Sequence, residues 1–147
     1  MSFDEQLNHL VEEALKEDIG DGDHSTLSSI DPAARGKAVL KIKEDGEKIF
    51  RFKEPGIIFT PFKKDGEPMQ YGEKAFEVEA HVHTILQCER LVLNCMQRMS
   101  GIATLTRKYT RLLEGYKTKL LDTRKTTPNL RLLEKEAVRI GGGVNHR

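Results

Sequence analysis

The chain has 147 residues, of which 37% are hydrophobic and 32% are charged, and its formal net charge is +1. This length allows one medium domain, or a small domain with part of another, and the composition is typical of soluble globular proteins. The small net charge and the absence of Trp give no support for nucleic-acid binding, and no apolar run is long enough for a transmembrane helix.

The N-terminal half predicts one helix followed by strands. Apolar residues at helical spacing predict an amphipathic helix over residues 3–17, which the turn residues 18–23 end. Alternating patterns predict strands over residues 37–43, 57–62 and 75–80, with Pro61 at a strand end or sheet edge. Further turns are predicted at residues 45–46, 65–66 and 71–72.

The C-terminal half predicts a long helix and then a strand and a second helix. The long helix covers residues 84–114, with a kink or break at Ser100-Gly101 and a stop at Gly115. A short strand is predicted over residues 119–121. Pro128 is placed to open the second helix, which runs to about Arg139 and ends at three glycines.

The order of these elements predicts the fold class. A helix, antiparallel strands and a long helix indicate an α+β domain over residues 1–115. The strand and helix that follow indicate the first βα unit of an α/β barrel over residues 116–147.

The two cysteines and the N-terminus predict the compartment. Cys88 and Cys95 lie seven positions apart on one helix face, about 10 Å apart along the axis, too far for a disulfide. Residues 1–5 are acidic and lack the apolar core of a signal peptide. We therefore expect a cytoplasmic protein with reduced thiols.

Arg124 and Lys125 form the first candidate site, between the predicted strand and helix. Residues at the carboxyl end of a barrel strand face the functional mouth, and a helix start favours anions. Arg can bind a carboxylate through two parallel hydrogen bonds, and Lys adds a mobile charge. The same pair is also typical of a helix start with solvated charges.

The second candidate is Gly141-Gly142-Gly143 with His146 and Arg147. Three glycines permit close backbone approach to a ligand, but they equally suit a helix end and a turn. Glu89-Arg90 by spacing alone indicates a charge pair on a surface or interface. The acidic residues 18–23 and the pair His81 and His83 lack the remaining ligands of a calcium or zinc site.

Four motifs together resemble one family, the quinolinate phosphoribosyltransferases. They are EDIGDGDHST at 17–26, ERLVLNCMQRMSGIAT at 89–104, DTRKTTP at 122–128 and the segment 132–147 that ends in GGGVNHR. The motifs come in the family's order and with similar spacing, and the resemblance is weaker only over residues 28–82. One departure lies between Gly46 and Glu47, where family members carry a further apolar, Gly-containing stretch.

The resemblance implies a function. Quinolinate would react with phosphoribosyl pyrophosphate, assisted by Mg²⁺, and give nicotinate mononucleotide, pyrophosphate and CO₂ for NAD biosynthesis. It implies that Arg90, Arg124 and Arg147 clamp the carboxylates of quinolinate, and that Lys125 and His146 add further donors. In the family the equivalent of Arg90 comes from a neighbouring subunit, which implies a homodimer or higher homo-oligomer.

The family's Mg²⁺ ligands and phosphate-binding loops belong to a part of the barrel that follows position 147. No catalytic residue and no metal ligand is therefore assigned here. We expect the chain alone to be inactive, and either to self-associate or to be poorly stable. Two other interpretations stay open. One is a non-catalytic oligomerisation or dicarboxylate-binding module, and the other is the related phosphoribosyltransferase linked to molybdenum transport.

Overall fold

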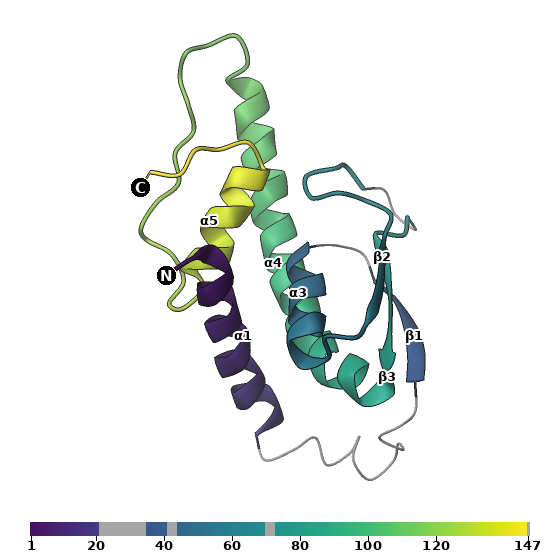
Figure 1. Ribbon diagram of the computed structural model, residues 1–147. Coiled ribbons are helices and arrows are strands. Elements are labelled where there is room, and N and C mark those ends of the chain that lie inside the picture. The colour runs from purple at the N-terminus through teal and green to yellow at the C-terminus, as the bar shows by residue number, and fades with distance from the viewer. Residues whose placement is uncertain (21–34, 41–43, 70–72, 147) are drawn as a thin grey trace. The chain divides into compact units, whose positions relative to one another are not determined.

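A computed structural model describes residues 1–20, 35–40, 44–69 and 73–146 (Figure 1), with only the backbone described at 35–40, 44 and 45. Its elements are α1 (Phe3–Ile19), β1 (Arg35–Leu40), α3 (Glu44–Lys53), β2 (Ile58–Pro61), β3 (Phe76–His81), α4 (Val82–Leu112) and α5 (Arg131–Ile140). Contacts divide the chain into two compact units, Met1–Met96 and Gln97–Arg147, and α4 contributes to both. The boundary predicted at residue 115 follows the end of α4, whereas the contacts divide the chain inside that helix.

The first unit contains a three-stranded antiparallel sheet in the order β1-β3-β2. Its central strand alternates, so that Phe76, Val78 and Ala80 are buried while Glu79 is exposed. Buried side chains from the helices of this unit complete the core: Leu7, Val11, Leu15, Ile49, Phe50, Ile85, Cys88, Val92, Cys95 and Met96. The predicted α+β architecture is confirmed, and Pro61 does lie at the end of an edge strand.

Helix α1 begins and ends close to the predicted positions. Ser2 and Glu5 form a reciprocal capping box, in which each side chain accepts a hydrogen bond from the other's backbone N–H. The three buried leucine and valine side chains of α1 recur every four residues, which places one apolar stripe on the core. None of the described helices has the length and apolar character needed to cross a membrane.

A polar cluster around Glu54 joins α3, β3 and α4 in the first unit. The Glu54 carboxylate, whose side chain is 15% exposed, accepts hydrogen bonds from the His81 backbone N–H at 3.2 Å and the Thr84 hydroxyl at 3.2 Å. It also pairs with His81 Nδ1. Burial raises the pKa of Glu54, but the hydrogen bonds and charge of His81 and the hydrogen bond from Thr84 outweigh burial, so the pKa lies below its usual value.

Replacing Glu54 with Gln should destabilise the first unit by about 1–3 kcal/mol at pH 7, because buried donors lose a charged acceptor. Since the folded pKa is lowered, the carboxylate stabilises the fold above its ordinary pKa of 4.5 and less as pH falls through the folded value. Urea unfolding at neutral and acidic pH should show a smaller difference between wild type and Glu54→Gln in acid. A constant difference would contradict this assignment.

The second unit pairs the C-terminal part of α4 with α5. Met99, Ala103 and Thr106 of α4 and Leu133 and Ala137 of α5 are buried. Leu121 before α5 forms a parallel bridge with Val144 after it. A strand position, a helix and a second parallel strand position therefore follow one another, as in an α/β unit. This confirms the predicted start of an α/β fold.

Three local predictions about turns and helices are corrected. Residues 45–46 lie inside α3 and form no turn, and Gly46 allows close packing, since an added Cβ would lie 3.3 Å from Val92 Cγ1. Helix α4 continues through Ser100 and Gly101 without a break. Helix α5 begins three residues after Pro128, because Asn129 has a left-handed φ of 66° that no helix accommodates.

The strand predicted over residues 119–121 is reduced to one paired residue. Leu121 bridges Val144, with hydrogen bonds from Val144 N to Leu120 O at 2.8 Å and from Asp122 N to Val144 O at 3.0 Å. Parallel strands occur in sheets whose two faces are both covered, and no other described residue pairs with this segment. The turns predicted at 21–23 and 71–72, and the strand end at 41–43, lie outside the described residues.

Candidate anion-binding site

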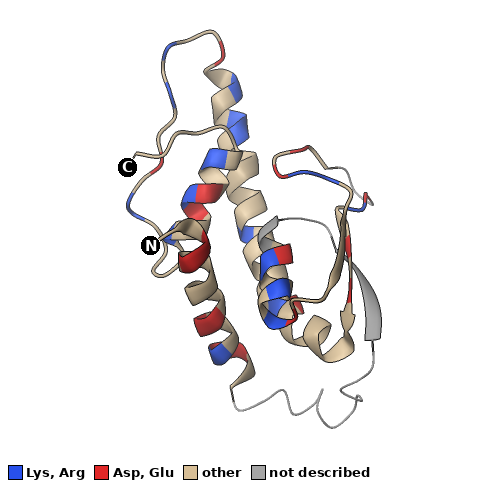
Figure 2. Cartoon of the chain, viewed as in Figure 1, with Lys and Arg blue, Asp and Glu red and all other residues tan. Residues whose placement is uncertain are grey.

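The segment 122–127, here called the cation loop, carries Arg124 and Lys125 between the Leu121 bridge and α5. Both side chains are exposed, and no carboxylate of the described chain forms an ion pair with either. Figure 2 shows basic residues along the segment that joins α4 to α5, and both signs of charge on α5 itself. The cation loop thus presents two adjacent positive charges to solvent, which suits a small anion with more than one carboxylate.

Helix α5 holds this loop through its first turn. Arg131 donates from Nη2 to the Arg124 carbonyl at 2.9 Å and from Nε to the Thr126 hydroxyl at 3.1 Å. A local hydrogen bond from Lys125 N to Thr123 Oγ1 at 3.1 Å shapes the turn between them. The backbone that carries the two exposed cations is therefore fixed by a side chain of the neighbouring helix.

Asp122 fixes the start of the cation loop. Its side chain is 3% exposed, and its two oxygens each lie 3.0 Å from Lys135 Nζ. Asp122 also accepts the His146 backbone N–H at 2.7 Å, and the Asn145 amide donates to it at 2.9 Å when its nitrogen faces the carboxylate. One carboxylate therefore joins the loop, α5 and the segment that carries His146.

The same contacts set the charge state of Asp122. Burial raises the pKa of Asp122, but the hydrogen bonds from His146 N and Lys135, together with the charge of Lys135, outweigh burial and hold the pKa below its usual value. Asp122 is therefore ionised at neutral pH.

Glu134 and Arg98 fix the other end of the loop. Arg98 of α4 donates to Glu134 Oε1 at 3.0 Å from Nε and 2.6 Å from Nη2, and Nη2 also contacts the Thr127 hydroxyl. Glu134 Oε2 accepts the Thr127 backbone N–H at 3.1 Å. Burial raises the pKa of Glu134, but the hydrogen bonds from Thr127 and Arg98 outweigh it, so the pKa is lowered.

The three glycines after α5 are explained by packing and turn geometry. A Cβ on Gly141 would lie 2.6 Å from the Ala103 carbonyl oxygen, and one on Gly143 would lie 2.6 Å from Val138 Cγ1. Gly142 has a φ of 98°, which side chains rarely adopt. The helix-end interpretation of the glycines accounts for all three, and they carry the chain from α5 to the Val144 bridge.

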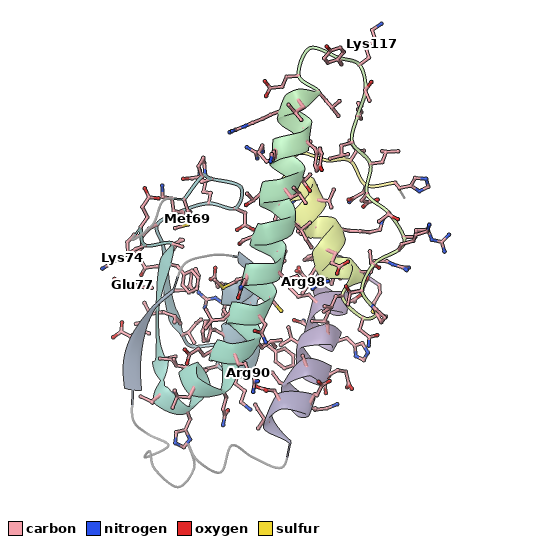
Figure 3. All side chains as sticks on the ribbon, turned by 180° about the vertical axis from the view of Figure 1, so that it is seen from behind. Met69, Lys74, Glu77, Arg90, Arg98 and Lys117 are labelled. Atoms are coloured by element: carbon pink, nitrogen blue, oxygen red, sulfur yellow. The ribbon has the colours of Figure 1, made fainter. Side chains whose placement is uncertain are left out.

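Arg90 lies on α4 within the first unit, and its side chain is 77% exposed (Figure 3). Its Nη1 lies 3.7 Å from Asp18 Oδ1 at the end of α1. Two of the motifs noted in the sequence therefore meet here. An exposed pair at this distance contributes little to stability, so the guanidinium can bind another anion at small cost.

The structure brings together part of the predicted set. Arg124, Lys125 and the exposed His146 belong to one network in the second unit, while Arg147 lies outside the described residues. Sequence reasoning missed the supporting side chains Asp122, Arg98, Arg131, Glu134 and Lys135. The spacing of the last three, at i, i+3 and i+4 along one helix, was the available signal.

Comparisons with protein families agree with this arrangement. The N-terminal domain model of quinolinate phosphoribosyl transferase matches residues 23–100, more than half of the chain, and the C-terminal domain model matches residues 102–147. A probable nicotinate-nucleotide pyrophosphorylase (carboxylating) of Bacillus subtilis is 41% identical and is matched over 97% of this chain and 52% of its own length. A quinolinate phosphoribosyltransferase (decarboxylating) of Nicotiana glauca is 41% identical, over 96% of this chain and 42% of its own length.

Solved structures give the same result. The crystal structure of NadC from Streptococcus pyogenes has a TM-score of 0.88 and 38% identity, covering 97% of this chain and 53% of that one. The nicotinate-nucleotide pyrophosphorylase from Francisella tularensis has a TM-score of 0.85 and 37% identity, covering 98% and 54%. The chain spans about half the length of these relatives. It belongs to the quinolinate phosphoribosyl transferase family.

Proposed function

We propose that this chain contributes the dicarboxylate-binding part of an enzyme that transfers the phosphoribosyl group of phosphoribosyl pyrophosphate to quinolinate. The ring nitrogen of quinolinate attacks C1 of the ribose, pyrophosphate leaves, and the 2-carboxylate is lost as CO₂, which gives nicotinate mononucleotide. Family membership and the names of the relatives support this reaction.

The observation that carries the proposal is the pair of exposed cations, Arg124 and Lys125, on a backbone held at both ends. Quinolinate is a flat dianion with adjacent carboxylates. Arg124 binds one carboxylate through two parallel N–H donors, and Lys125 neutralises the second. His146, Arg147 and Arg90 add donors around the same ligand, and Arg90 does so from a neighbouring subunit of a homodimer or higher homo-oligomer.

In this proposal the cations bind and orient quinolinate so that its nitrogen faces the ribose carbon. Holding two reactants in a productive geometry is itself a large part of catalysis. Mg²⁺ would assist the departure of pyrophosphate. Among the residues that the structure describes, no group of three or more His, Cys, Asp or Glu side chains could hold a metal ion, so none is assigned to Mg²⁺. A cytoplasmic location also stays a prediction.

Calorimetry of ligand binding tests the proposal. Quinolinate should bind more tightly than nicotinate, which has one carboxylate, because only the dianion uses both cations. Arg124→Ala should weaken quinolinate binding by about 10- to 100-fold, as expected for a lost charge-assisted contact. Lys117→Ala, which removes an exposed cation from the segment before the cation loop, should leave the affinity unchanged.

The same titrations separate the alternatives. Equal affinity for quinolinate and nicotinate would contradict a dicarboxylate site. A preference for another aromatic acid would favour the phosphoribosyltransferase linked to molybdenum transport. No binding heat with either ligand would leave an oligomerisation role, which sedimentation over a range of concentrations would reveal.

A further inference from the structure

Helix α5 contacts the cation loop with one polar face, formed by Arg131, Glu134 and Lys135. These residues lie at i, i+3 and i+4 and so share one side of the helix. Leu133 and Ala137, on another side, are buried in the second unit. The helix is thus fixed to the core by apolar contacts and presents a rigid polar face to the loop.

The three residues of this polar face contact the loop at its start, middle and end. Lys135 pairs with Asp122 at the start, Arg131 holds the Arg124 carbonyl, and Glu134 accepts the Thr127 N–H at the end. Arg124 and Lys125, the two cations of the loop, lie between these contacts and are exposed, without a carboxylate partner in the described chain.

We propose that the polar face of α5 is a positioning device that fixes the cation loop, so that Arg124 and Lys125 are held in place before an anion arrives. The inference rests on the proposed function for its ligand. Lys135 and Glu134 are neutralised by Asp122 and Arg98, so they act on the ligand through the loop. A preorganised site loses less conformational freedom on binding, which raises affinity without a new contact.

The variant Glu134→Gln distinguishes a charge effect from a positioning effect, because the two predict opposite changes in the affinity for quinolinate. If Glu134 acted only through its charge, removing a negative charge near an anion site would tighten quinolinate binding. Positioning predicts the reverse, because Gln replaces one of the two acceptor oxygens with a donor and releases Thr127 or Arg98. We expect quinolinate binding to weaken by about 3- to 10-fold, the effect of one net hydrogen bond.

Glu136→Gln is the matched control, since it makes the same charge change on the same helix. Glu136 pairs with Arg139 and forms no hydrogen bond or ion pair with the loop. The affinity of the Glu136→Gln variant for quinolinate should equal or slightly exceed that of wild type. Tighter binding by Glu134→Gln, or equal binding by both variants, would overturn the proposal.

The variant Arg131→Lys is a second test, because it keeps the positive charge of residue 131 but alters how this residue holds the cation loop. Lys keeps the positive charge but lacks the planar fork that reaches both the Arg124 carbonyl and the Thr126 hydroxyl. Weaker quinolinate binding by this variant supports positioning, and unchanged binding opposes it. In the Arg124→Ala background, Glu134→Gln should weaken quinolinate binding less than it does in wild type, because only Lys125 is then left to position.

Hydrogen exchange makes the test independent of the ligand. In the free chain, Glu134→Gln should speed amide exchange at Thr127, and Glu136→Gln should not. If wild type fails to bind quinolinate but this difference holds, the proposed function fails and the loop restraint stands. If exchange at Thr127 is the same in wild type and both variants, the positioning role itself is overturned.

Discussion

Gly141→Ala should destabilise the chain by about 3 kcal/mol, at the upper end of the range for overpacking a core. An added methyl group would lie 2.6 Å from the Ala103 carbonyl oxygen and 2.7 Å from Thr106 Cβ. Neither atom is the end of a flexible side chain, so α4 and α5 would have to separate. Separation would also stretch the hydrogen bonds from Arg107 to the carbonyls of Ile140 and Gly141.

Thermal unfolding followed by circular dichroism measures this effect, with an expected fall in Tm on the order of 10 °C. Gly101→Ala is the matched control, because nothing lies within 4 Å of its ideal Cβ and it is an exposed position inside α4. Alanine there should stabilise the helix by about 0.5–1 kcal/mol. If both variants melted like wild type, the close approach of α5 to α4 at Gly141 would be wrong.

The contrast between these two glycines shows what the sequence could and could not predict. Apolar spacing located α1, α4 and the three strands, because burial on one face imposes a period that is visible in the residues. Pro128 and the three glycines located α5. The same reasoning treated Ser100-Gly101 as a break and the glycines after α5 as ambiguous. Whether a glycine is needed depends on what lies opposite it, and Ala103 is 38 positions away from Gly141.

The residues of the candidate site could likewise be predicted from the sequence only in part. Arg124, Lys125 and His146 were recognised from the motifs that carry them. The residues that hold them were not, because Arg98 meets Glu134 across 36 positions and Asp122 meets Lys135 across 13. The order of charged residues along the chain does not show which oppositely charged residue each of them will contact in the fold. The backbone of Asn129 was also not predicted. Its left-handed conformation moves the start of α5 to Arg131, three residues after Pro128, where the sequence had favoured a helix start.

Lys135→Met should destabilise the chain more than any surface substitution, by about 3–5 kcal/mol, because it leaves the Asp122 carboxylate buried without a counter-charge. The Asp122 side chain is 3% exposed and the Lys135 side chain 17%. Lys135→Arg, which keeps the charge, should retain most of the stability. Removing one charge from the exposed pair on α1, through Glu13→Gln beside Lys16, should leave Tm unchanged.

The pH dependence of the same pair follows from the lowered pKa of Asp122. A carboxylate whose pKa is depressed in the folded state stabilises it above the ordinary value of 3.8, and that contribution is lost as pH falls through the lower folded value. Asp122→Asn removes this source of acid sensitivity. Urea unfolding between about pH 5 and pH 2 should therefore show a shallower loss of stability in Asp122→Asn than in wild type. Parallel curves would mean that Asp122 is not held ionised by Lys135 and His146 N–H, and the link it makes between the cation loop and the His146 segment would then fail as well.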